Sequence, residues 1–272
     1  MKQLNGTELA EFIKERQTKQ VRSLRQSARV APKLVIISCN DDPIIRTYIG
    51  LKKSYGEDIA VEVEDVAVAQ SEIQQVIAQY NSDDSVNGII VQLPLIDQSQ
   101  TDEIVNSIDP AKDVDALGNQ AALDPATPTA IMWLLAGYNI DLRGKKIVIV
   151  GNGRLVGAPM HRMLGNSGLD DVTVIDINTK NPDALLLAAD VVISATGHHG
   201  VIHTDNIKHG AVVVDAGVAS EHGKLVGDAA DNLYDRDDLI ITPKKGGVGP
   251  ITVCALFDNV IRAAQEHAKH AA

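Results

Sequence analysis

The feature that most constrains the fold is an apolar run that leads directly into a glycine-rich turn. The run Lys145-Lys-Ile-Val-Ile-Val150 is continuous and rich in β-branched residues. Such a run is typical of a strand buried on both faces of a parallel sheet. Similar runs recur at 172–176, 191–195 and 211–215, with room between them for crossover helices or short loops. This half of the chain therefore predicts a parallel α/β domain.

The turn after this strand reads Gly151-Asn-Gly-Arg-Leu-Val-Gly157, and Pro159 follows at a position compatible with an early helical turn. Glycines between a strand and a helix let the backbone approach a pyrophosphate, which the helix N-terminus then binds. The spacing is GxGxxxG rather than GxGxxG. Taken alone, it would fit a tight structural turn equally well. The preceding strand and the following β/α alternation favour a dinucleotide site.

Asp176 closes the next strand, about 25 residues beyond Gly151. An acid at this distance can bind the adenosine ribose hydroxyls, and it would repel the extra phosphate of NADP. The adjacent residues 177–179 are Ile, Asn and Thr, so none of them is basic. The pattern favours NAD. Two alternatives stay open: Asp176 is a solvated strand end or helix cap, or Arg154 binds the phosphate of NADP.

The first third of the chain also alternates between strands and helices. Apolar runs at 33–38, 59–63 and 86–93 predict strands, and the stretches 43–55 and 71–80 have helical spacing. Farther on, Thr127-Pro128 is suited to an N-cap and first helical turn, and 252–270 reads as a final helix. A small α/β domain therefore precedes the second one.

Chain length and composition agree with two globular domains. The 272 residues exceed one typical domain, and 44% are hydrophobic and 22% charged. No apolar run approaches the ~20 residues that span a bilayer. The opening Met1-Lys-Gln-Leu-Asn-Gly6 has no signal or transit character, so a cytosolic protein is expected.

Cys39 and Cys254 lack metal-ligand spacing, and we expect two buried thiols rather than a disulfide or a zinc site.

The charge disfavours nucleic acid as a partner. The formal net charge is -11 and only 3% of residues are aromatic. Phosphate backbones need clustered Lys and Arg, and single strands need stacking platforms. Anionic ligands would have to be bound locally.

A second group of candidate residues lies in the first domain. Tyr48 and Lys52 are four residues apart, hence on one face of the predicted helix. A lysine acts as a general acid or base only where burial or neighbours lower its pKa, so a functional Lys52 must be partly enclosed. The alternative is a surface lysine, as Lys53 next to it suggests.

Three further polar residues fall near strand ends. Gln92 ends the apolar run Gly88-Ile-Ile-Val-Gln-Leu-Pro-Leu95, at the kind of position where α/β sheets bind ligands. Asp113 and Asp115 lie before the predicted interdomain passage. A carboxylate there could bind a guanidine-like heterocycle edge through two hydrogen bonds. Asp113 could instead cap a turn.

Five motifs together give a specific resemblance. They are Tyr48-x-x-x-Lys52, Gly88 to Leu95, Lys112-Asp-Val-Asp115, Gly151 to Pro159, and Gly246-Gly-Val-Gly-Pro-Ile-Thr252. In order and spacing the chain resembles the bifunctional methylenetetrahydrofolate dehydrogenase/methenyltetrahydrofolate cyclohydrolase family over nearly its whole length. The resemblance implies two α/β domains: 1–121 as the folate-binding catalytic domain, with helix 252–270 packing back on it, and 122–251 as the Rossmann NAD(P)-binding domain. It also implies an active site between the domains and a homodimer formed largely through the cofactor domain.

The resemblance implies a role for each candidate residue. Lys52 would be the catalytic lysine, Tyr48 would position the folate, Gln92 would tune Lys52, and Asp115 would hold the pterin. Gly249 and Pro250 would also contact the substrate. The dinucleotide would contact the following residues: Gly151, Asn152, Gly153, Arg154, Val156, Gly157, Asp176, Ala195, Thr196, Gly197 and Val218. The methylene carbon would give hydride to the nicotinamide, and water would then hydrolyse the methenyl product to formyltetrahydrofolate. No metal is required.

The sequence departs from the family pattern in two groups of positions. Around the folate motifs, Ile45 replaces a serine, Ala116 a glycine, Ala126 and Ala130 a cysteine and a glycine, and Ile96 and Lys245 prolines. In the cofactor loops, Asn152-Gly153 stands in place of Arg-Ser and Asp176 in place of a histidine. The second group removes affinity for a ribose phosphate, so NAD is expected in a family more commonly linked to NADP.

Three other interpretations fit the sequence less well. A short-chain dehydrogenase is rejected, because its Tyr-x-x-x-Lys follows the glycine turn whereas Lys52 lies 99 residues before Gly151 (151 minus 52). A two-domain dehydrogenase of the shikimate or amino-acid type would not account for Gln92-Leu-Pro94 or 246–252. A non-catalytic folate or dinucleotide sensor is disfavoured by the retained polar set.

Overall fold

The computed structural model describes residues 1–221 and 224–271. These residues form two compact units. Unit 1 consists of Met1–Ala10 and Thr127–Thr252, and unit 2 of Glu11–Ala126 and Val253–Ala272. The division falls five residues beyond the 121/122 boundary predicted from the sequence, and the first ten residues belong to unit 1 rather than to the N-terminal domain. The cause is that strand β1, Lys2–Gln3, pairs in the sheet of unit 1.

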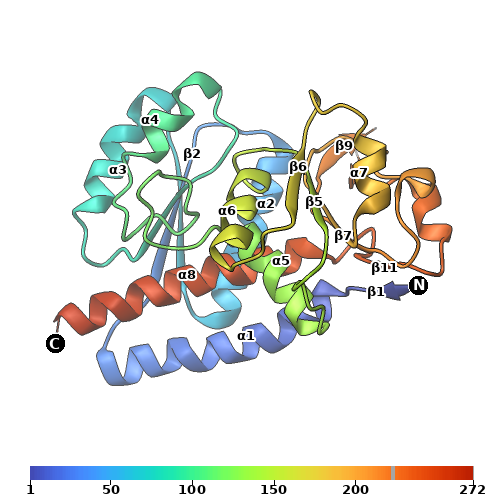
Figure 1. Ribbon diagram of the computed structural model, residues 1–272. Coiled ribbons are helices and arrows are strands. Elements are labelled where there is room, and N and C mark those ends of the chain that lie inside the picture. The colour runs from blue at the N-terminus through green and yellow to red at the C-terminus, as the bar shows by residue number, and fades with distance from the viewer. Residues whose placement is uncertain (222–223, 272) are drawn as a thin grey trace. The chain divides into compact units, whose positions relative to one another are not determined.

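The sheet of unit 2 is parallel and has the order β3-β2-β4. Its strands are β2 (Lys33–Ser38), β3 (Glu62–Ala67) and β4 (Gly88–Val91). Helix α2 (Pro43–Ile59) connects β2 to β3, and α3 (Ile73–Asn81) returns past β2 to β4. Because both crossovers are expected to be right-handed, α2 and α3 cover opposite faces, as Figure 1 shows. The chain connections leave β2 in opposite directions, so the topological switch point of this sheet lies at the carboxyl ends of β2 and β4.

The core of unit 2 explains why β2 is an unbroken apolar run. Val35 and Ile37 pack with Ile73 and Ile77 of α3 in one cluster. The alternating residues Leu34 and Ile36 point to the other face and are equally buried. A strand covered on both sides needs apolar residues at every position.

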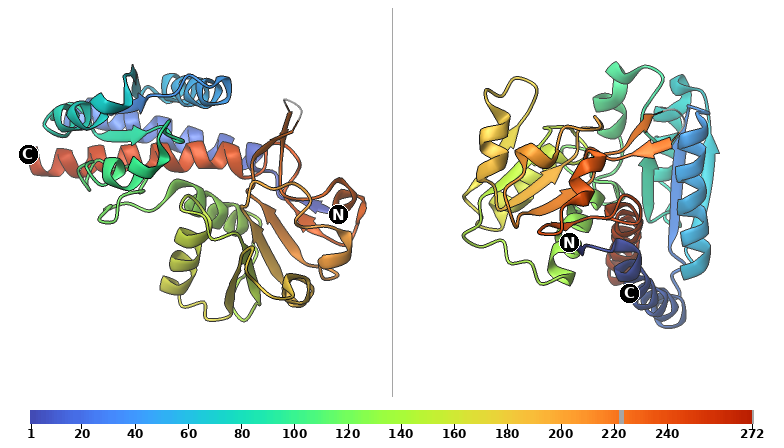
Figure 2. Two further views of the ribbon diagram at one scale, coloured as in Figure 1. Left: turned by 90° about the horizontal axis from the view of Figure 1, so that it is seen from above. Right: turned by 90° about the vertical axis from the view of Figure 1, so that its right-hand side faces the viewer.

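Two long helices complete unit 2 from opposite ends of the chain. Helix α1 (Gly6–Ser23) continues into the π-helix η1 (Leu24–Ala28), and α8 spans Val248–Ala271. Figure 2 shows α1 and α8 side by side. The buried Gln17 amide of α1 donates to the carbonyl of Cys254, and the Tyr55 ring of α2 contacts Phe257. The remaining short elements are η2 (Gln70–Glu72), η3 (Gln98–Gln100) and α4 (Thr101–Val105).

The larger sheet, in unit 1, is parallel and has the order β1-β11-β8-β7-β5-β6. Its other strands are β5 (Ile147–Val150), β6 (Val172–Ile175), β7 (Val191–Ser194), β8 (Val212–Asp215) and β11 (Ile240–Ile241). The connecting elements are α5 (Ala126–Gly137), α6 (Gly157–Asn166), α7 (Pro182–Ala188), η4 (Thr204–Asn206), η5 (Asp231–Asp235) and the antiparallel pair β9 (Ala219–Glu221) and β10 (Lys224–Val226). The predicted fold class, two α/β domains with parallel sheets, is confirmed.

Several predicted boundaries were wrong by a few residues. The strand expected at 59–63 begins only at Glu62, because α2 runs on to Ile59 and ends at Ala60 in a left-handed conformation. Helix α5 begins at Ala126, which places Thr127 inside the first turn rather than at the N-cap. Helix α8 begins at Val248 rather than Thr252. Of the two thiols, Cys254 is buried but Cys39, just beyond β2, is partly exposed.

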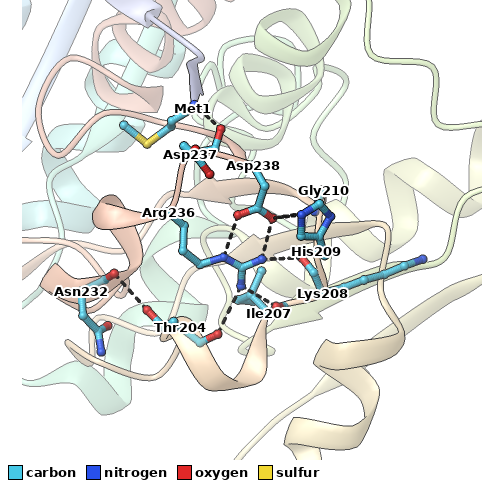
Figure 3. A network of polar contacts seen from close by, with 10 residues as sticks. All are labelled: Met1, Thr204, Ile207, Lys208, His209, Gly210, Asn232, Arg236, Asp237 and Asp238. Carbon is cyan, nitrogen blue, oxygen red and sulfur yellow. Dashed lines mark hydrogen bonds and ion pairs between the residues drawn. The ribbon is translucent and has the colours of Figure 1, made fainter.

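An arginine ties together the loops on the β11 side of unit 1 (Figure 3). The Arg236 guanidinium binds both carboxylate oxygens of Asp238, at 3.0 and 2.6 Å, and donates to the carbonyls of Thr204 and Ile207. The guanidinium holds the pKa of Asp238 well below its ordinary value. A bidentate pair with little exposure fixes geometry as well as charge. It therefore anchors the turn that leads into β11.

Within the described residues, no helix is both long and apolar enough to cross a membrane.

Candidate active site

The candidate site in unit 2 contains a hydrogen bond between Lys52 and Gln92, near the switch point of the sheet. Lys52 lies on α2, and Gln92 follows the last residue of β4. The Lys52 Nζ donates to Gln92 Oε1 over 2.7 Å. The Gln92 amide in turn donates to the carbonyl of Leu93, while its backbone N–H pairs with Ile37 of β2. Both ends of this hydrogen bond are thus held by the secondary structure.

Lys52 is enclosed, as a functional lysine requires, whereas the neighbouring Lys53 is exposed. Burial lowers the pKa of the Lys52 ammonium, and the Asp115 carboxylate partly offsets this effect. Burial likewise raises the pKa of Asp115, against the opposing effect of the Lys52 charge. Each group keeps some accessible surface although protein atoms surround it. Lys52, Gln92 and Asp115 therefore form one interacting set, in which burial disfavours the charged form of Lys52 and the Asp115 carboxylate favours it.

Tyr48 and Asp113 flank this set in different ways. Tyr48 lies one helical turn before Lys52 and is half-buried, which raises the pKa of its phenol. Asp113 is 2% exposed, and its Oδ2 accepts the Gly118 N–H at 2.7 Å. Burial raises the pKa of Asp113. Asp113 thus caps a turn, as one of the two sequence interpretations held.

The glycine turn of unit 1 has the geometry that close backbone approach requires. Gly151 has φ +96°, and a Cβ there would lie 2.9 Å from the Ala195 carbonyl oxygen. A Cβ on Gly157 would lie 1.9 Å from the Gly151 carbonyl oxygen, which is closer than any real contact. A Cβ on Gly153 would meet open space. The outer glycines therefore close the turn, while the middle one leaves the backbone open to a ligand.

The helix behind this turn has no side-chain cap. Helix α6 begins at Gly157, and among the described residues no side chain caps it at Val156. By contrast, the Asp42 side chain caps α2 by accepting the Ile44 N–H at 2.7 Å. In the first turn of α6 the Ala158 N–H donates to the Gly153 carbonyl at 3.1 Å and Pro159 has no N–H. The Gly157 N–H and the positive dipole end of α6 are therefore the parts of this helix start that suit a phosphate.

Asp176 lies just beyond β6 and shapes its own loop. Its Oδ1 accepts the N–H of Asn178 at 2.9 Å and the hydroxyl of Thr179 at 3.2 Å. These bonds lower the pKa of Asp176, with the Asn178 N–H as the largest cause. The side chain is exposed and charged at neutral pH. The next side chain, Ile177, is 99% exposed.

The sequence interpretation missed two acids, one buried and one partly buried, that shape the neighbouring loops. Asp228 is fully buried, and its carboxyl accepts from the Ser194 hydroxyl at 2.6 Å, the Thr196 N–H at 2.7 Å and the His198 N–H at 3.1 Å. It thereby fixes the loop that contains Ala195, Thr196 and Gly197. The only sequence signal is the Gly227-Asp228 turn after an apolar pair.

The second of these acids is Asp215, at the end of β8. Its carboxyl accepts the N–H groups of Gly217, Asp228 and Ala229 at 2.9–3.1 Å. Burial raises the pKa of Asp215. The loop that it holds leads to Val218, which is 55% exposed. An acid at the end of an apolar strand was a usable signal for this position.

The predicted residues thus separate into two sets. Tyr48, Lys52, Gln92 and Asp115 lie in unit 2. The glycine turn, Asp176, the loop 195–197 and Val218 lie in unit 1, as do Gly249 and Pro250 in the first turn of α8. A parallel sheet with a glycine turn and an uncapped helix, in one chain with an enclosed lysine, defines a two-domain dinucleotide-dependent enzyme.

Comparisons with known proteins identify the family. Residues 4–115 match the catalytic domain, and residues 125–268 the NAD(P)-binding domain, of tetrahydrofolate dehydrogenase/cyclohydrolase. The bifunctional protein FolD of Acetivibrio thermocellus is 38% identical, over 98% of both chains. The chain therefore belongs to the tetrahydrofolate dehydrogenase/cyclohydrolase family.

Solved structures agree with this assignment. The bifunctional FolD methylenetetrahydrofolate dehydrogenase/cyclohydrolase from Campylobacter jejuni has a TM-score of 0.91 and 35% identity, covering 98% of this chain and 99% of that one. The methylenetetrahydrofolate dehydrogenase-cyclohydrolase of Trypanosoma brucei, solved with NADP and an inhibitor, has a TM-score of 0.89 and 29% identity over 96% of both chains.

Proposed function

We propose that this chain is a bifunctional enzyme of one-carbon metabolism. It oxidises methylenetetrahydrofolate to methenyltetrahydrofolate with NAD(P), and it hydrolyses the product to formyltetrahydrofolate. The observation that carries the proposal is the 2.7 Å hydrogen bond between Lys52 Nζ and Gln92 Oε1. It puts an enclosed amine where an α/β sheet binds its ligand, in a chain that belongs to this family.

The residues of unit 2 bind the folate and move protons. Asp115 accepts hydrogen bonds from the amino-pyrimidine edge of the pterin, and Tyr48 positions the ring system. Lys52 transfers a proton as water adds to the methenyl carbon, and burial lowers the pKa of its ammonium into a more useful range. Gln92 holds the amine by accepting from it. Gly249 and Pro250 complete the substrate contacts.

The residues of unit 1 bind the dinucleotide, whose nicotinamide ring supplies a hydride acceptor when bound. The N–H groups of the glycine turn and the Gly157 N–H at the start of α6 bind the pyrophosphate, since no side chain described there caps the helix. The loops held by Asp215 and Asp228 present Ala195, Thr196, Gly197 and Val218 to the rest of the cofactor.

NAD is the preferred cofactor in this proposal. Asp176 is exposed, with a pKa lowered by the Asn178 N–H, so it carries a charge that repels a ribose phosphate. Asn152 and Gly153 supply no cation to the turn. Arg154 is the one basic residue in the turn itself and is the residue to test if NADP is used. By family resemblance we also propose a cytosolic homodimer.

The decisive experiment supplies purified protein with methylenetetrahydrofolate and either NAD or NADP. Reduction of the nicotinamide and loss of the methenyl product are followed by absorbance in parallel. Faster reduction of NAD is the expected result. Preference for NADP would overturn the assignment of Asp176 and point to Arg154. If neither cofactor is reduced although folate binds, the chain is a sensor rather than an enzyme.

A further inference from the structure

A buried amide on α8 reaches the segment that carries Asp115. Asn259 is 3% exposed, and its side-chain nitrogen donates two hydrogen bonds. The Nδ2 donates to the carbonyl of Val114 at 2.9 Å and to the carbonyl of Asp124 at 2.8 Å. One NH₂ group thus uses both hydrogens on carbonyls ten residues apart, which closes the segment 114–124 against α8.

The residues just before this segment, Lys112 and Asp113, are held by the sheet and by the end of α3. The N–H of Ile89 in β4 donates to the carbonyl of Lys112 at 2.8 Å, and Ile89 forms a parallel bridge with Asp113. The Lys112 ammonium donates to the carbonyls of Tyr80, Asn81 and Asp83, at 2.8–3.0 Å, where α3 ends. Residues 112 and 113 are therefore fixed before the chain reaches Asp115.

The chain turns sharply just after Asp115, and this turn needs support. Ala116 has φ +54°, in the left-handed region that a side chain disfavours. Strained residues persist only where the surrounding structure over-determines them. The Asn259 bonds hold the carbonyl of residue 114, directly before Asp115, and that of residue 124 after the turn. They restrain the backbone on both sides of the strained position.

We infer that Asn259 is a positioning residue for folate binding, which acts by fixing the backbone that presents Asp115. The inference rests on the proposed function, in which Asp115 binds the pterin. The Asn259 side chain donates to main-chain carbonyls, and the proposal assigns it no contact with the substrate. Its loss should weaken folate binding and leave the dinucleotide site in unit 1 unaffected.

The test compares Asn259→Leu with a matched variant of the same unit, Gln17→Leu. The Gln17 amide is fully buried, donates to the Cys254 carbonyl of α8 at 2.8 Å and to Asp258 at 3.4 Å, and accepts from the Tyr55 hydroxyl at 2.7 Å. None of these hydrogen bonds reaches residues 112–124. For both variants and for Asp115→Asn, we would measure KM for methylenetetrahydrofolate, KM for the dinucleotide and the thermal unfolding midpoint. Should Asn259→Leu fail to fold, Asn259→Ser, which keeps one donor, takes its place.

The expected result is a rise of about tenfold in the folate KM of Asn259→Leu, with the dinucleotide KM within about twofold. Gln17→Leu should lower the unfolding midpoint comparably and leave both KM values within about twofold. Equal shifts in folate KM for the two variants, or no shift for Asn259→Leu while Asp115→Asn binds folate poorly, would overturn the inference. If Asp115→Asn binds folate normally, the proposed function fails first.

Discussion

The order β3-β2-β4 in unit 2 is repeated as β6-β5-β7 in unit 1. In each case the first of the three strands lies in the middle, so each sheet has a topological switch point at the carboxyl ends of its first and third strands. In unit 2 the side chains of Lys52 and Gln92 meet near this point, and Asp42 caps the start of the adjoining helix. In unit 1 the glycine turn lies there, and among the described residues no side chain caps the start of the adjoining helix.

The difference teaches how one topology serves two kinds of ligand. Proton transfer needs a side chain whose pKa is set by its surroundings, so the helix must bring a lysine into an enclosed place. Pyrophosphate binding needs N–H groups close to the ligand, so side chains must be absent and the helix end open. Substitutions should therefore act through chemistry in unit 2 and through shape or charge in unit 1.

The largest effect is expected from Lys52→Met. Hydrolysis of methenyltetrahydrofolate should fall by roughly 10²- to 10⁴-fold, the usual contribution of a general acid or base. Lys53→Met is the matched control, because Lys53 is the exposed neighbour on the same helix. Steady-state loss of the methenyl absorbance measures both variants. Similar rates for the two variants would mean that Lys52 has no chemical role.

A smaller loss is expected from Gly157→Ala in unit 1. The new Cβ would lie 1.9 Å from the Gly151 carbonyl oxygen, so the turn must move. A displacement of about 1 Å can cost roughly 100-fold, which should appear in the KM for the dinucleotide. Gly165→Ala in the same helix is the control, because its new Cβ would meet open space. It should raise the free energy of unfolding by about 0.5–1 kcal/mol. Weaker folate binding by Gly157→Ala would contradict the separation of roles.

A carboxylate at the start of α6 would test the comparison directly. Val156→Asp should change the free energy of unfolding little, because the Ala158 N–H already donates to the Gly153 carbonyl and Pro159 has no N–H for the new side chain to accept from. The same carboxylate should repel the pyrophosphate and weaken dinucleotide binding about tenfold. Chemical denaturation and titration of the cofactor measure the two quantities. Unchanged affinity would show that the phosphate does not use this helix end.

The smallest effect is expected from Gln92→Leu, as a shift in the pH dependence of the rate of hydrolysis. Gln92 Oε1 accepts from the Lys52 ammonium, which favours the charged form, and Gln92→Leu removes that support. Burial already lowers the pKa of Lys52, so the variant should lower this pKa further. The pH at which hydrolysis begins to rise should therefore move to lower values in rate profiles of the two proteins. A shift to higher pH would contradict the role of Gln92.

The sequence predicted best where a signal is local. The β2 run 33–38 and the starts of β6 and β7 were placed correctly, and the glycine turn was located because three glycines in seven residues lie between a strand and a helix. Strands β1 and β11 have two residues each, too few to show a period. The end of α2 was misplaced because its apolar spacing continues past Tyr55 to Ile59.

The candidate site was predicted in part for the same reason. Tyr48 and Lys52 share a helix face by spacing, and Gln92 and Asp115 were singled out as a polar strand end and an acid before the interdomain passage, with their roles implied by the resemblance. Asp228 and the Asn259 amide have partners 34 and 145 residues away in the chain. Local spacing along the sequence does not indicate such a pair.

By itself, then, the sequence determined the alternation of strands and helices, the class of fold and the presence of a dinucleotide turn, since period and glycine spacing are properties of neighbouring residues. Only the tertiary structure decided that Lys52 is enclosed while Lys53 is exposed, and that a side chain caps the start of α2 while the first turn of α6 bonds to the backbone of Gly153. Burial, pKa and capping depend on what packs around a group, and the packing atoms come from distant parts of the chain.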